Sequence, residues 1–384
     1  MCISPVTIPN PRLDYHPLWH RAFMQVPCGN CVECRESKRN QLATRLSVHS
    51  WQVRQQGGTT LFLTFSYNNA HLPHIMYRDN AIPAFSRRDV KQFLKALRRY
   101  YNKHGKSFTY ILVCEYGKNT KRPHYHMMPF LPKDIDPTEF AEKAREYWTH
   151  MYIKEKDIYV NNGYMFPSKT DVKRGKHIVY HSKSCAYYAS KYATKDLTFY
   201  GLPFISEIVK NPDLKEVYKN YLPHTYISPN IGWSWFHDYL VNNPAATKCT
   251  NPCTGTVVNI PDYAINKFCY DCYRGDELNS KGQRKTVREL NDAGFIRRKT
   301  ILMNLIEKKL QVYKSYGYDN DLSYKMAVYH YIYRGFTTTQ MYNIMDENKK
   351  YGISLFDGEW VNIMMNTSLW RFPIEYIPNY KQYI

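Results

Sequence analysis

The chain has 384 residues and a formal net charge of +20, from 53 lysines and arginines against 33 acidic residues. Hydrophobic residues make up 43%, which excludes a disordered chain, and no apolar run reaches the ~20 residues of a membrane helix. The segment from Met1 to Arg21 lacks the apolar core of a secretory signal. We therefore expect a globular cytoplasmic protein, and the large positive charge favours a polyanionic partner, nucleic acid first.

The first predicted element is a basic amphipathic helix over residues 33–54. This stretch has no proline or glycine and places Leu42, Leu46 and Val53 among arginines and lysines at near-helical spacing. Gly57-Gly58 predicts its end. Residues 59–65 then predict a strand, because they are rich in threonine, leucine and phenylalanine.

A second helix and a hairpin follow. Ser86 and Asp89 are spaced as in a capping box, which predicts a helix over residues 87–101. Two apolar runs, 108–115 and 124–131, predict paired strands with a turn near Asn119-Thr120.

The next segment completes an alternation of strands and helices. Asp136-Pro137 begins a helix expected to extend through Trp148. Short strands are predicted over 157–161 and 177–181, and a short helix from Ser184 to Lys195. Hairpins with intervening helices favour an α+β fold, with helices on one face of a central antiparallel sheet.

The composition changes near residue 241. A cysteine-bearing segment follows, then a long predicted helical region from Thr286 to Lys314, and then tyrosine-rich sequence. We therefore divide the chain into a cysteine cluster with the basic helix (1–57), the sheet-and-helix domain (58–240), and a cysteine-containing, mainly helical region (241–384).

The predicted hairpin carries a candidate metal site. Alternate residues of a strand share a face, so His124 and His126 are expected to point the same way. A turn near Asn119-Thr120 places Glu115 directly opposite His124, roughly 5 Å away. Two imidazoles and a carboxylate hold a divalent cation and leave coordination positions open. A shift of one residue in register would turn Glu115 to the other face.

A second candidate constellation lies further along the chain. On a helix, Tyr188 and Tyr192 share one face, and Lys191 and Lys195 adjoin it. A phenol attacks a phosphodiester when a metal polarises the phosphoryl oxygens and a cation stabilises the developing charge. The alternative is that both tyrosines are core or interface aromatics, since the chain has 36 tyrosines.

Seven of the ten cysteines fall in two clusters, and without a secretion signal clusters indicate metal sites and not disulfides. Cys28, Cys31 and Cys34 supply three thiolates, and Cys2 could supply a fourth. Thiolates select zinc; unliganded thiols or an iron–sulfur site are the alternatives. The spacing in the second cluster resembles that of a zinc ribbon: Cys249, Cys253, Cys269 and Cys272.

The order of these motifs resembles a known family. Three motifs occur in the order found in the HUH endonucleases, which this chain resembles. They are Glu115-Tyr-Gly, then Arg122-Pro-His-Tyr-His, then the two-tyrosine motif that ends at Lys195. More narrowly, they resemble the replication initiator proteins of gokushovirus-type microviruses. The resemblance covers roughly residues 28–240 and extends to the first cysteine group, Phe62-Leu-Thr-Phe with Leu72-Pro73, and Gly232-Trp-Ser-Trp.

The resemblance implies a tyrosine-dependent, metal-dependent DNA endonuclease with a ferredoxin-like (RRM-like) palm. Such an enzyme nicks single-stranded or supercoiled phage origin DNA, stays linked to the 5′ phosphate, and later rejoins the ends. It implies that His124 and His126 bind Mg²⁺ or Mn²⁺ with Glu115 as third ligand. It also implies that Tyr188 and Tyr192 are alternating nucleophiles, assisted by lysines at the phosphate or leaving group: Lys191 and Lys195.

The resemblance further implies a host helicase and polymerase as partners, no membrane, and the host bacterial cytoplasm as location. Structural zinc at the cysteines stays an additional expectation. Two other functions are open at this stage. One is a transposase or relaxase of the same chemistry, and the other is a non-enzymatic, zinc-braced DNA-binding protein in which the histidines are structural.

Overall fold

The structure is a computed structural model. It describes residues 2–9, 23–29, 31–117, 120–153, 158–179, 186–187, 190, 203–278, 282 and 284–317. The chain divides into two compact units, Met1–Trp235 with Thr250–Pro261, and Phe236–Cys249 with Asp262–Ile384. Among the described helices, none is long and apolar enough to cross a membrane.

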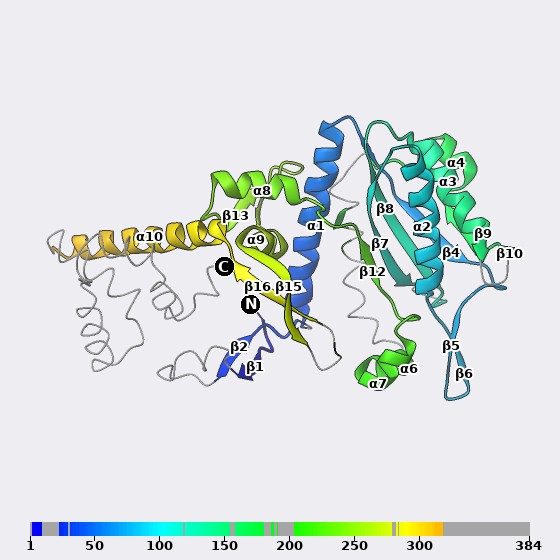
Figure 1. The fold of residues 1–384 in the computed structure, drawn as a ribbon, viewed down its shortest axis with the longest axis horizontal. Helices are drawn as coiled ribbons and strands as arrows, with labels where there is room; N and C mark the ends of the chain where they lie inside the picture. The colour runs from blue at the N-terminus through cyan, green and yellow to red at the C-terminus, as the bar shows by residue number, and fades with distance from the viewer. Residues whose placement is uncertain are drawn as a thin grey trace. The chain divides into compact units, whose positions relative to one another are not determined.

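The first unit is built on a six-stranded antiparallel sheet (Figure 1). The strand order is β11-β4-β8-β7-β12, and β3 also pairs with β8. The strands are β3 (Thr59–Thr60), β4 (Leu63–Tyr67), β7 (Thr109–Tyr116), β8 (Pro123–Leu131), β11 (Gly163–Phe166) and β12 (Thr225–Ile227). The predicted antiparallel sheet is therefore confirmed.

Two predicted strands differ in detail. Residues 59–65 form two short strands, β3 and β4, and not one. Leu61, between them, pairs with Ile178 in an isolated bridge, which is the only strand-like pairing of the described part of 177–181.

The register of β7 and β8 agrees with the prediction. Glu115 lies opposite His124, and Val113 lies opposite His126. The turn between the strands is closed by the Gly117 N–H, which donates to the Arg122 carbonyl at 2.9 Å. His124, His126 and Glu115 therefore share one face of the sheet.

The opposite face is covered by α2 (Arg87–Lys103) and α3 (Pro137–Thr149), as Figure 1 shows. Both predicted N-caps are present, with Ser86 Oγ accepting from the Asp89 N–H and Asp136 Oδ1 from the Glu139 N–H. The apolar spacing of α2 puts its buried residues on one side, where they pack on the sheet: Val90, Phe93, Leu94, Leu97 and Tyr101.

The face that carries His126 is also covered by a helix, so the expectation of helices on one face only is wrong. The helix α1 (Val32–Gln55) packs Leu42, Leu46 and Val53 against strand residues including Met128 and Phe130. Residues 109–114 and 125–131 are apolar at successive positions, and a strand that is apolar on both sides needs cover on both.

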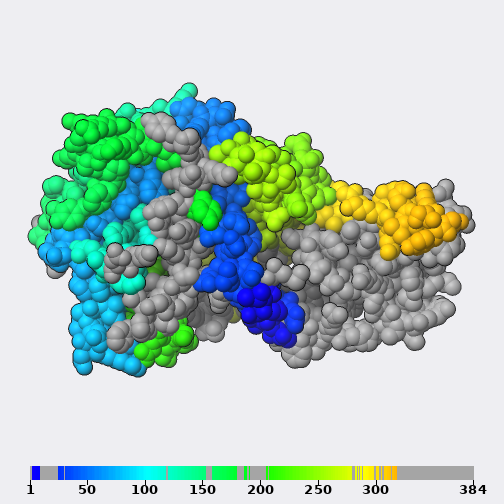
Figure 2. All heavy atoms as spheres, turned by 180° about the vertical axis from the view of Figure 1, so that it is seen from behind, coloured from blue at the N-terminus to red at the C-terminus, as the bar shows by residue number. Residues whose placement is uncertain are grey.

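The predicted helix over 33–54 is confirmed, but it is not simply amphipathic. Its buried residues include small polar side chains, which find partners: Ser50 Oγ lies 2.8 Å from Thr60 Oγ1, and Ser47 Oγ donates to the Thr44 carbonyl at 3.0 Å. Gly57, with a φ of +79°, follows its end. In Figure 2 the blue band of α1 crosses the surface, with the dark-blue N-terminal residues at one end.

Short elements surround this core. The hairpins are β1 (Val6–Pro9) with β2 (Phe23–Val26), β5 (His74–Tyr77) with β6 (Asn80–Pro83), and β9 (Met151–Ile153) with β10 (Ile158–Val160). The short helices are α4 (Lys169–Lys173), α6 (Pro203–Lys210) and α7 (Pro212–Tyr218). The β5–β6 hairpin and α6 share a small core that includes Ile75, Ile205 and Ile208.

The segment from 233 onward contains α8 (Trp233–Asn242), β13 (Lys248–Thr250), β14 (Val257–Asn259), α9 (Asp262–Cys269), β15 (Tyr270–Leu278), β16 (Arg284–Leu290) and α10 (Asp292–Ser315). In the described part of the predicted helical region, helical residues outnumber strand residues, but the strands β13 to β16 are present as well. The predicted helix from Thr286 begins only at Asp292, because residues 284–290 pair with β15. Asn291 ends that strand and caps α10, accepting the Gly294 N–H at 2.9 Å.

Candidate active site

His126 and Glu115 form a close pair on the central strands. His126 Nε2 lies 2.9 Å from Glu115 Oε2, and its other ring nitrogen lies 2.9 Å from Thr64 Oγ1. Thr64 stands opposite His126 in the neighbouring strand β4. The Phe62 ring stacks on the imidazole, with 5.6 Å between the centroids. The imidazole is 8% exposed and is fixed by contacts with three strands or their connections.

This arrangement fits a divalent cation bound between the two side chains. Thr64 Oγ1 can accept from Nδ1–H, which leaves the Nε2 lone pair on the side of Glu115. When two neighbouring ligand atoms each lie about 2.1 Å from an octahedral ion, they lie about 3.0 Å from one another. The distance between His126 Nε2 and Glu115 Oε2, 2.9 Å, is close to this value. The donor set of one imidazole and one carboxylate suits Mg²⁺ or Mn²⁺.

His124 lies on the same face of the sheet, but its ring does not join the contact between His126 and Glu115. Its ring packs against Gly117, where an added Cβ would lie 3.1 Å from Cε1. In the described part of the chain, Glu115, His124 and His126 do not form a set with their three ligand atoms together. Burial lowers the pKa of His124, which favours the neutral imidazole that metal binding requires.

Tyr125, the residue between the two histidines, lies on the opposite face of the sheet. Tyr125 is buried, accepts the Ser86 N–H at 2.9 Å, and lies 3.0 Å from the Tyr67 hydroxyl. Tyr67 in turn donates to Asp89 Oδ2. This chain of hydrogen bonds connects β8 to the first turn of α2, so it fixes the strand on which both histidines stand.

Arg122 and Thr64 are positioning residues that the sequence alone did not single out. The Arg122 guanidinium donates to the Tyr67 carbonyl at 2.6 and 3.2 Å and to Asn69 Oδ1 at 2.9 Å. These bonds hold the β7–β8 turn against the end of β4. The Arg-Pro pair before the first histidine was the available signal for Arg122, whereas the role of Thr64 depends on strand pairing.

The predicted nucleophiles and their lysines lie outside the described residues: Tyr188, Lys191, Tyr192 and Lys195. Three neighbours are described. Ala186 is buried in the same core as Ile111 and Val113, on the sheet face that carries Glu115 and His126. Tyr187 lies under the Arg39 guanidinium at 5.0 Å, and Ser190 Oγ donates to the Tyr187 carbonyl. The chain therefore reaches the sheet face that carries His126 at Ala186.

A basic groove runs along α2 on the other side of the sheet. It consists of two adjoining clefts of about 730 and 680 Å³, both lined by Lys91. Its cations are Arg87, Arg88, Lys91, Lys95, Arg98, Arg99 and Lys103, and we call this surface the α2 groove. Among the described residues, Asp89 is the one acidic residue that lines it.

Three cations of the α2 groove are available for an anionic partner. Within the described chain, Lys91, Lys95 and Arg99 pair with no acidic side chain. Arg98 is held by Tyr110, donating to its hydroxyl at 3.0 Å and lying 4.9 Å from its ring centroid. The helix is about 25 Å long at 1.5 Å per residue, which spans several phosphates of a nucleic-acid strand.

The structure treats the two predicted cysteine sets differently. Among the described residues, the one group of three or more cysteine, histidine or acidic side chains that gathers its ligand atoms is Cys2, Cys28, Cys31 and Cys34. Cys249, Cys269 and Cys272 of the second unit form no such group, and Cys253 belongs to the first unit. Zinc at this second set stays a prediction.

Sequence comparisons find similarity between this part of the chain and replication-associated proteins. Residues 60–197, which contain the histidine and tyrosine motifs, match a family of replication-associated proteins of the ORF2 type. The resemblance to phage replication initiators indicated by the motifs is confirmed by this match and by the relatives below.

Two relatives are viral replication proteins. The chain is 29% identical over 176 residues to Replication-associated protein ORF2 of Spiroplasma virus 4, covering 45% of this chain and 48% of the relative. It is 25% identical over 179 residues to Replication-associated protein VP4 of Bdellovibrio phage phiMH2K, covering 46% and 50%. The chain thus spans about half the length of the curated relatives it matches. No solved structure matches it.

Proposed function

We propose that this chain starts rolling-circle replication of a phage genome by nicking single-stranded origin DNA and later rejoining the ends. The observation that carries the proposal is the His126–Glu115 pair on two central strands, inside the segment that matches the replication-associated family. The names of the relatives favour replication over a transposase or relaxase with the same chemistry.

Glu115 and His126 would hold Mg²⁺ or Mn²⁺, with His124 on the same face as the third candidate ligand. Such an ion polarises a phosphoryl oxygen of the scissile phosphate. Thr64 fixes the tautomer of His126, and Phe62 shields its ring from water. The carboxylate of Glu115 supplies the negative charge that a hard divalent cation requires.

Tyr188 and Tyr192 are the proposed nucleophiles. The phenolic oxygen loses its proton to solvent and forms a bond to phosphorus, and the bond to the 3′ oxygen breaks. The 3′ oxygen takes up a proton from solvent and becomes a free 3′ hydroxyl. Rejoining reverses the step, because a 3′ hydroxyl attacks the phosphotyrosine and releases the phenol. Lys191 and Lys195 would neutralise the phosphate or the leaving oxygen. Support comes from Ala186, which packs on the His126 face shortly before Tyr188.

The tyrosine pair gives the direct test of this proposal. With single-stranded origin oligonucleotides and Mn²⁺, Tyr188→Phe and Tyr192→Phe are each expected to retain cleavage. The double variant is expected to form no covalent protein–DNA adduct on a denaturing gel, because neither phenol remains. Tyr159→Phe with Tyr164→Phe, both exposed on β10 and β11, is the matched control and should behave as wild type.

Two outcomes would contradict the proposal. An adduct formed by the double variant would remove these tyrosines as nucleophiles. Wild-type protein that forms no adduct with any origin-derived oligonucleotide, yet still binds DNA, would favour the non-enzymatic DNA-binding protein, in which His126 and Glu115 form a structural hydrogen bond.

The α2 groove is the proposed contact for the DNA backbone outside the nicking site. Its cations match phosphate oxygens, and the partly exposed Tyr226 in its wall offers aromatic surface. It lies on the sheet face opposite to His126, so the scissile strand and the gripped segment would contact different surfaces of one sheet. Binding of a host helicase and polymerase stays a prediction.

Gly117→Ala tests whether His124 belongs to the metal site. The added Cβ would lie 3.1 Å from His124 Cε1 and 3.4 Å from Nδ1, so the ring must shift. We expect Mn²⁺ affinity, measured by isothermal titration calorimetry, to fall about 10-fold, the low end for a disturbed ligand shell. Gly105→Ala is the control: its φ of +67° makes the substitution strained, but nothing lies within 4 Å. Equal Mn²⁺ affinity in both variants would exclude His124 as a ligand.

A further inference from the structure

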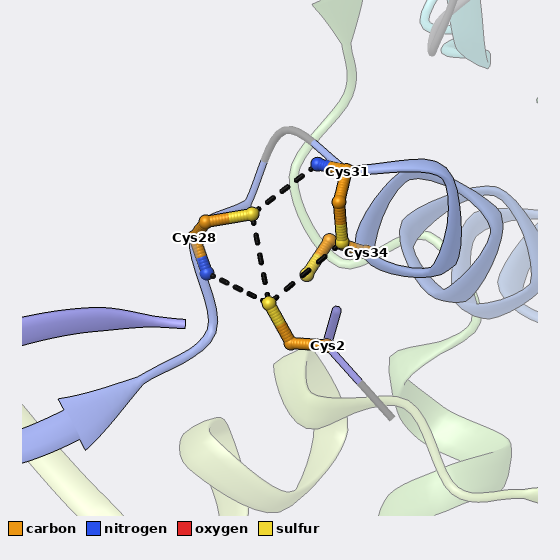
Figure 3. A group of neighbouring side chains, drawn as sticks. All are labelled: Cys2, Cys28, Cys31 and Cys34. Atoms are coloured by element: carbon orange, nitrogen blue, oxygen red, sulfur yellow. Dashed lines mark hydrogen bonds between the residues drawn. The ribbon is translucent and has the colours of Figure 1, made fainter. Parts of the chain in front are cut away.

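Four cysteine sulfurs meet at the start of α1 (Figure 3). Cys2 Sγ lies 3.6 Å from Cys28 Sγ and 3.7 Å from Cys31 Sγ. With Cys34, all four sulfurs lie within 4.8 Å of one another. The side chains come from the N-terminal segment, the loop after β2 and the first turn of the helix, and Figure 3 shows them turned toward one point.

The distances separate a metal site from a disulfide. A disulfide requires about 2.05 Å between its sulfurs, and all four residues are free cysteines. Four sulfurs bound at about 2.3 Å to one tetrahedral zinc ion lie about 3.8 Å apart. The observed separations of 3.6 and 3.7 Å correspond to the edges of that tetrahedron. The space between the sulfurs suits one ion and not a multi-iron cluster.

The backbone around the sulfurs is arranged as around thiolates. The Cys28 N–H donates to Cys2 Sγ at 3.3 Å, and the Cys31 N–H donates to Cys28 Sγ at 3.2 Å. Gly29 has a φ of +76°, a left-handed conformation that turns the chain between Cys28 and Cys31. Amide groups directed at sulfur and the N-terminal end of a helix both stabilise negative charge.

Local structure explains how Cys2 reaches the site from so far away in sequence. The β1–β2 hairpin pairs Val6 with Val26, so the residues just before β1 lie beside those just after β2. Cys31 occupies the N-cap position of α1 without a side-chain cap, and its sulfur is directed to Cys2. Lys38, about two turns further along the helix, donates to the Gly29 carbonyl at 3.0 Å and closes the loop.

We propose that Cys2, Cys28, Cys31 and Cys34 bind one Zn²⁺ in a closed tetrahedral site that fastens the N-terminal segment to α1. Four thiolates leave no open coordination position, so the ion is structural and takes no part in nicking. Binding releases a proton from each cysteine that is still a thiol. The same helix, through Leu42, Leu46 and Val53, covers the sheet face with His126, so the site stabilises the cover of the candidate active site.

The test is metal content of the full-length protein, measured by mass spectrometry of the elements after purification without chelator. Cys31→Ser is expected to contain about one equivalent of zinc less than wild type. Cys114→Ala, altered at a buried cysteine of the other sheet face, and Cys253→Ser, altered in the second cysteine set, are the controls. Neither control is expected to change the zinc bound by Cys2, Cys28, Cys31 and Cys34. The cobalt spectrum of the protein reports on this set.

Substitution of Co²⁺ for zinc identifies the ligand type and the coordination geometry from the absorption spectrum. Wild-type protein exchanged with Co²⁺ is expected to show the strong visible bands of a tetrahedral ion and thiolate charge-transfer bands. Cys2→Ser is expected to weaken and shift these bands, because one thiolate is replaced. Cys114→Ala should leave them unchanged. Chelation of wild-type protein is expected to speed amide hydrogen exchange in residues 2–9 and the first turn of α1.

Three results would overturn the proposal: a Cys31→Ser variant with wild-type zinc, a cobalt spectrum unaffected by Cys2→Ser, or iron in place of zinc as the ion of the purified protein. Disulfides among these four residues under non-reducing mass spectrometry would overturn it as well. None of these readouts requires DNA cleavage, so failure of the zinc site and failure of the proposed nicking activity are distinguishable.

Discussion

His126→Ala is expected to lower nicking of a single-stranded origin oligonucleotide by about 10²–10³-fold at saturating DNA and fixed Mn²⁺. The loss corresponds to about 3–4 kcal/mol of transition-state stabilisation, the several kcal/mol that a correctly held metal ion supplies. His126 is the better-held of the two histidines, because its nitrogens lie 2.9 Å from Glu115 and from Thr64.

Thr64→Val distinguishes a metal ligand from a structural histidine. The variant keeps the shape of the side chain but removes the partner of His126 Nδ1. We expect Mn²⁺ affinity to fall 10–100-fold, within the range for lost outer-shell partners, and high Mn²⁺ to restore the nicking rate. His126→Ala should not be restored in this way, because the ligand itself is missing.

His150→Ala is the matched control for both variants, since His150 is exposed at the end of α3. Its nicking rate and its Mn²⁺ dependence should equal those of wild type. If His126→Ala folds and nicks at the wild-type rate, the His126–Glu115 pair is structural and the metal site must be sought elsewhere.

Removing three cations from the α2 groove is expected to weaken DNA binding strongly. Each phosphate contact contributes about 0.9 to the slope of log affinity against log salt on duplex DNA. The triple variant Lys91→Gln, Lys95→Gln and Arg99→Gln should therefore lower that slope by about 2.7 if each side chain contacts one phosphate. The measurement is fluorescence anisotropy of a labelled duplex over a series of salt concentrations.

The control for this experiment keeps the change of net charge the same. Lys133→Gln, Lys169→Gln and Lys173→Gln remove three exposed lysines of the first unit that lie outside the α2 groove. This control should retain the wild-type slope to within about one contact. Equal losses in the two triple variants would show that overall charge, and not the groove, attracts the DNA.

The β8 strand explains how one short sequence serves two purposes. Its odd-numbered residues, Tyr125 and Met127, enter the core beneath α2 and α3. Its even-numbered residues, His124 and His126, stand on the opposite face beside Glu115. Because side chains alternate along a strand, the aromatic anchor at Tyr125 fixes the histidines without occupying their face.

The sequence by itself determined the elements that depend on short-range interactions. The caps at Ser86 and Asp136 define the starts of α2 and α3 through bonds to residues three positions on. The register of β7 and β8 followed from the length of the turn, since two strands joined by one tight connection have few ways to pair. Glu115 opposite His124 is the result.

Only the tertiary structure decided which distant segments meet. Cover of the His126 face by α1 and the partner Thr64 on a neighbouring strand both depend on contacts across long sequence separations. Cys2 was an optional fourth ligand by sequence, and the β1–β2 hairpin places it beside Cys28. Spacing along a chain specifies a local pattern, but the choice of its partner follows from packing of the whole unit.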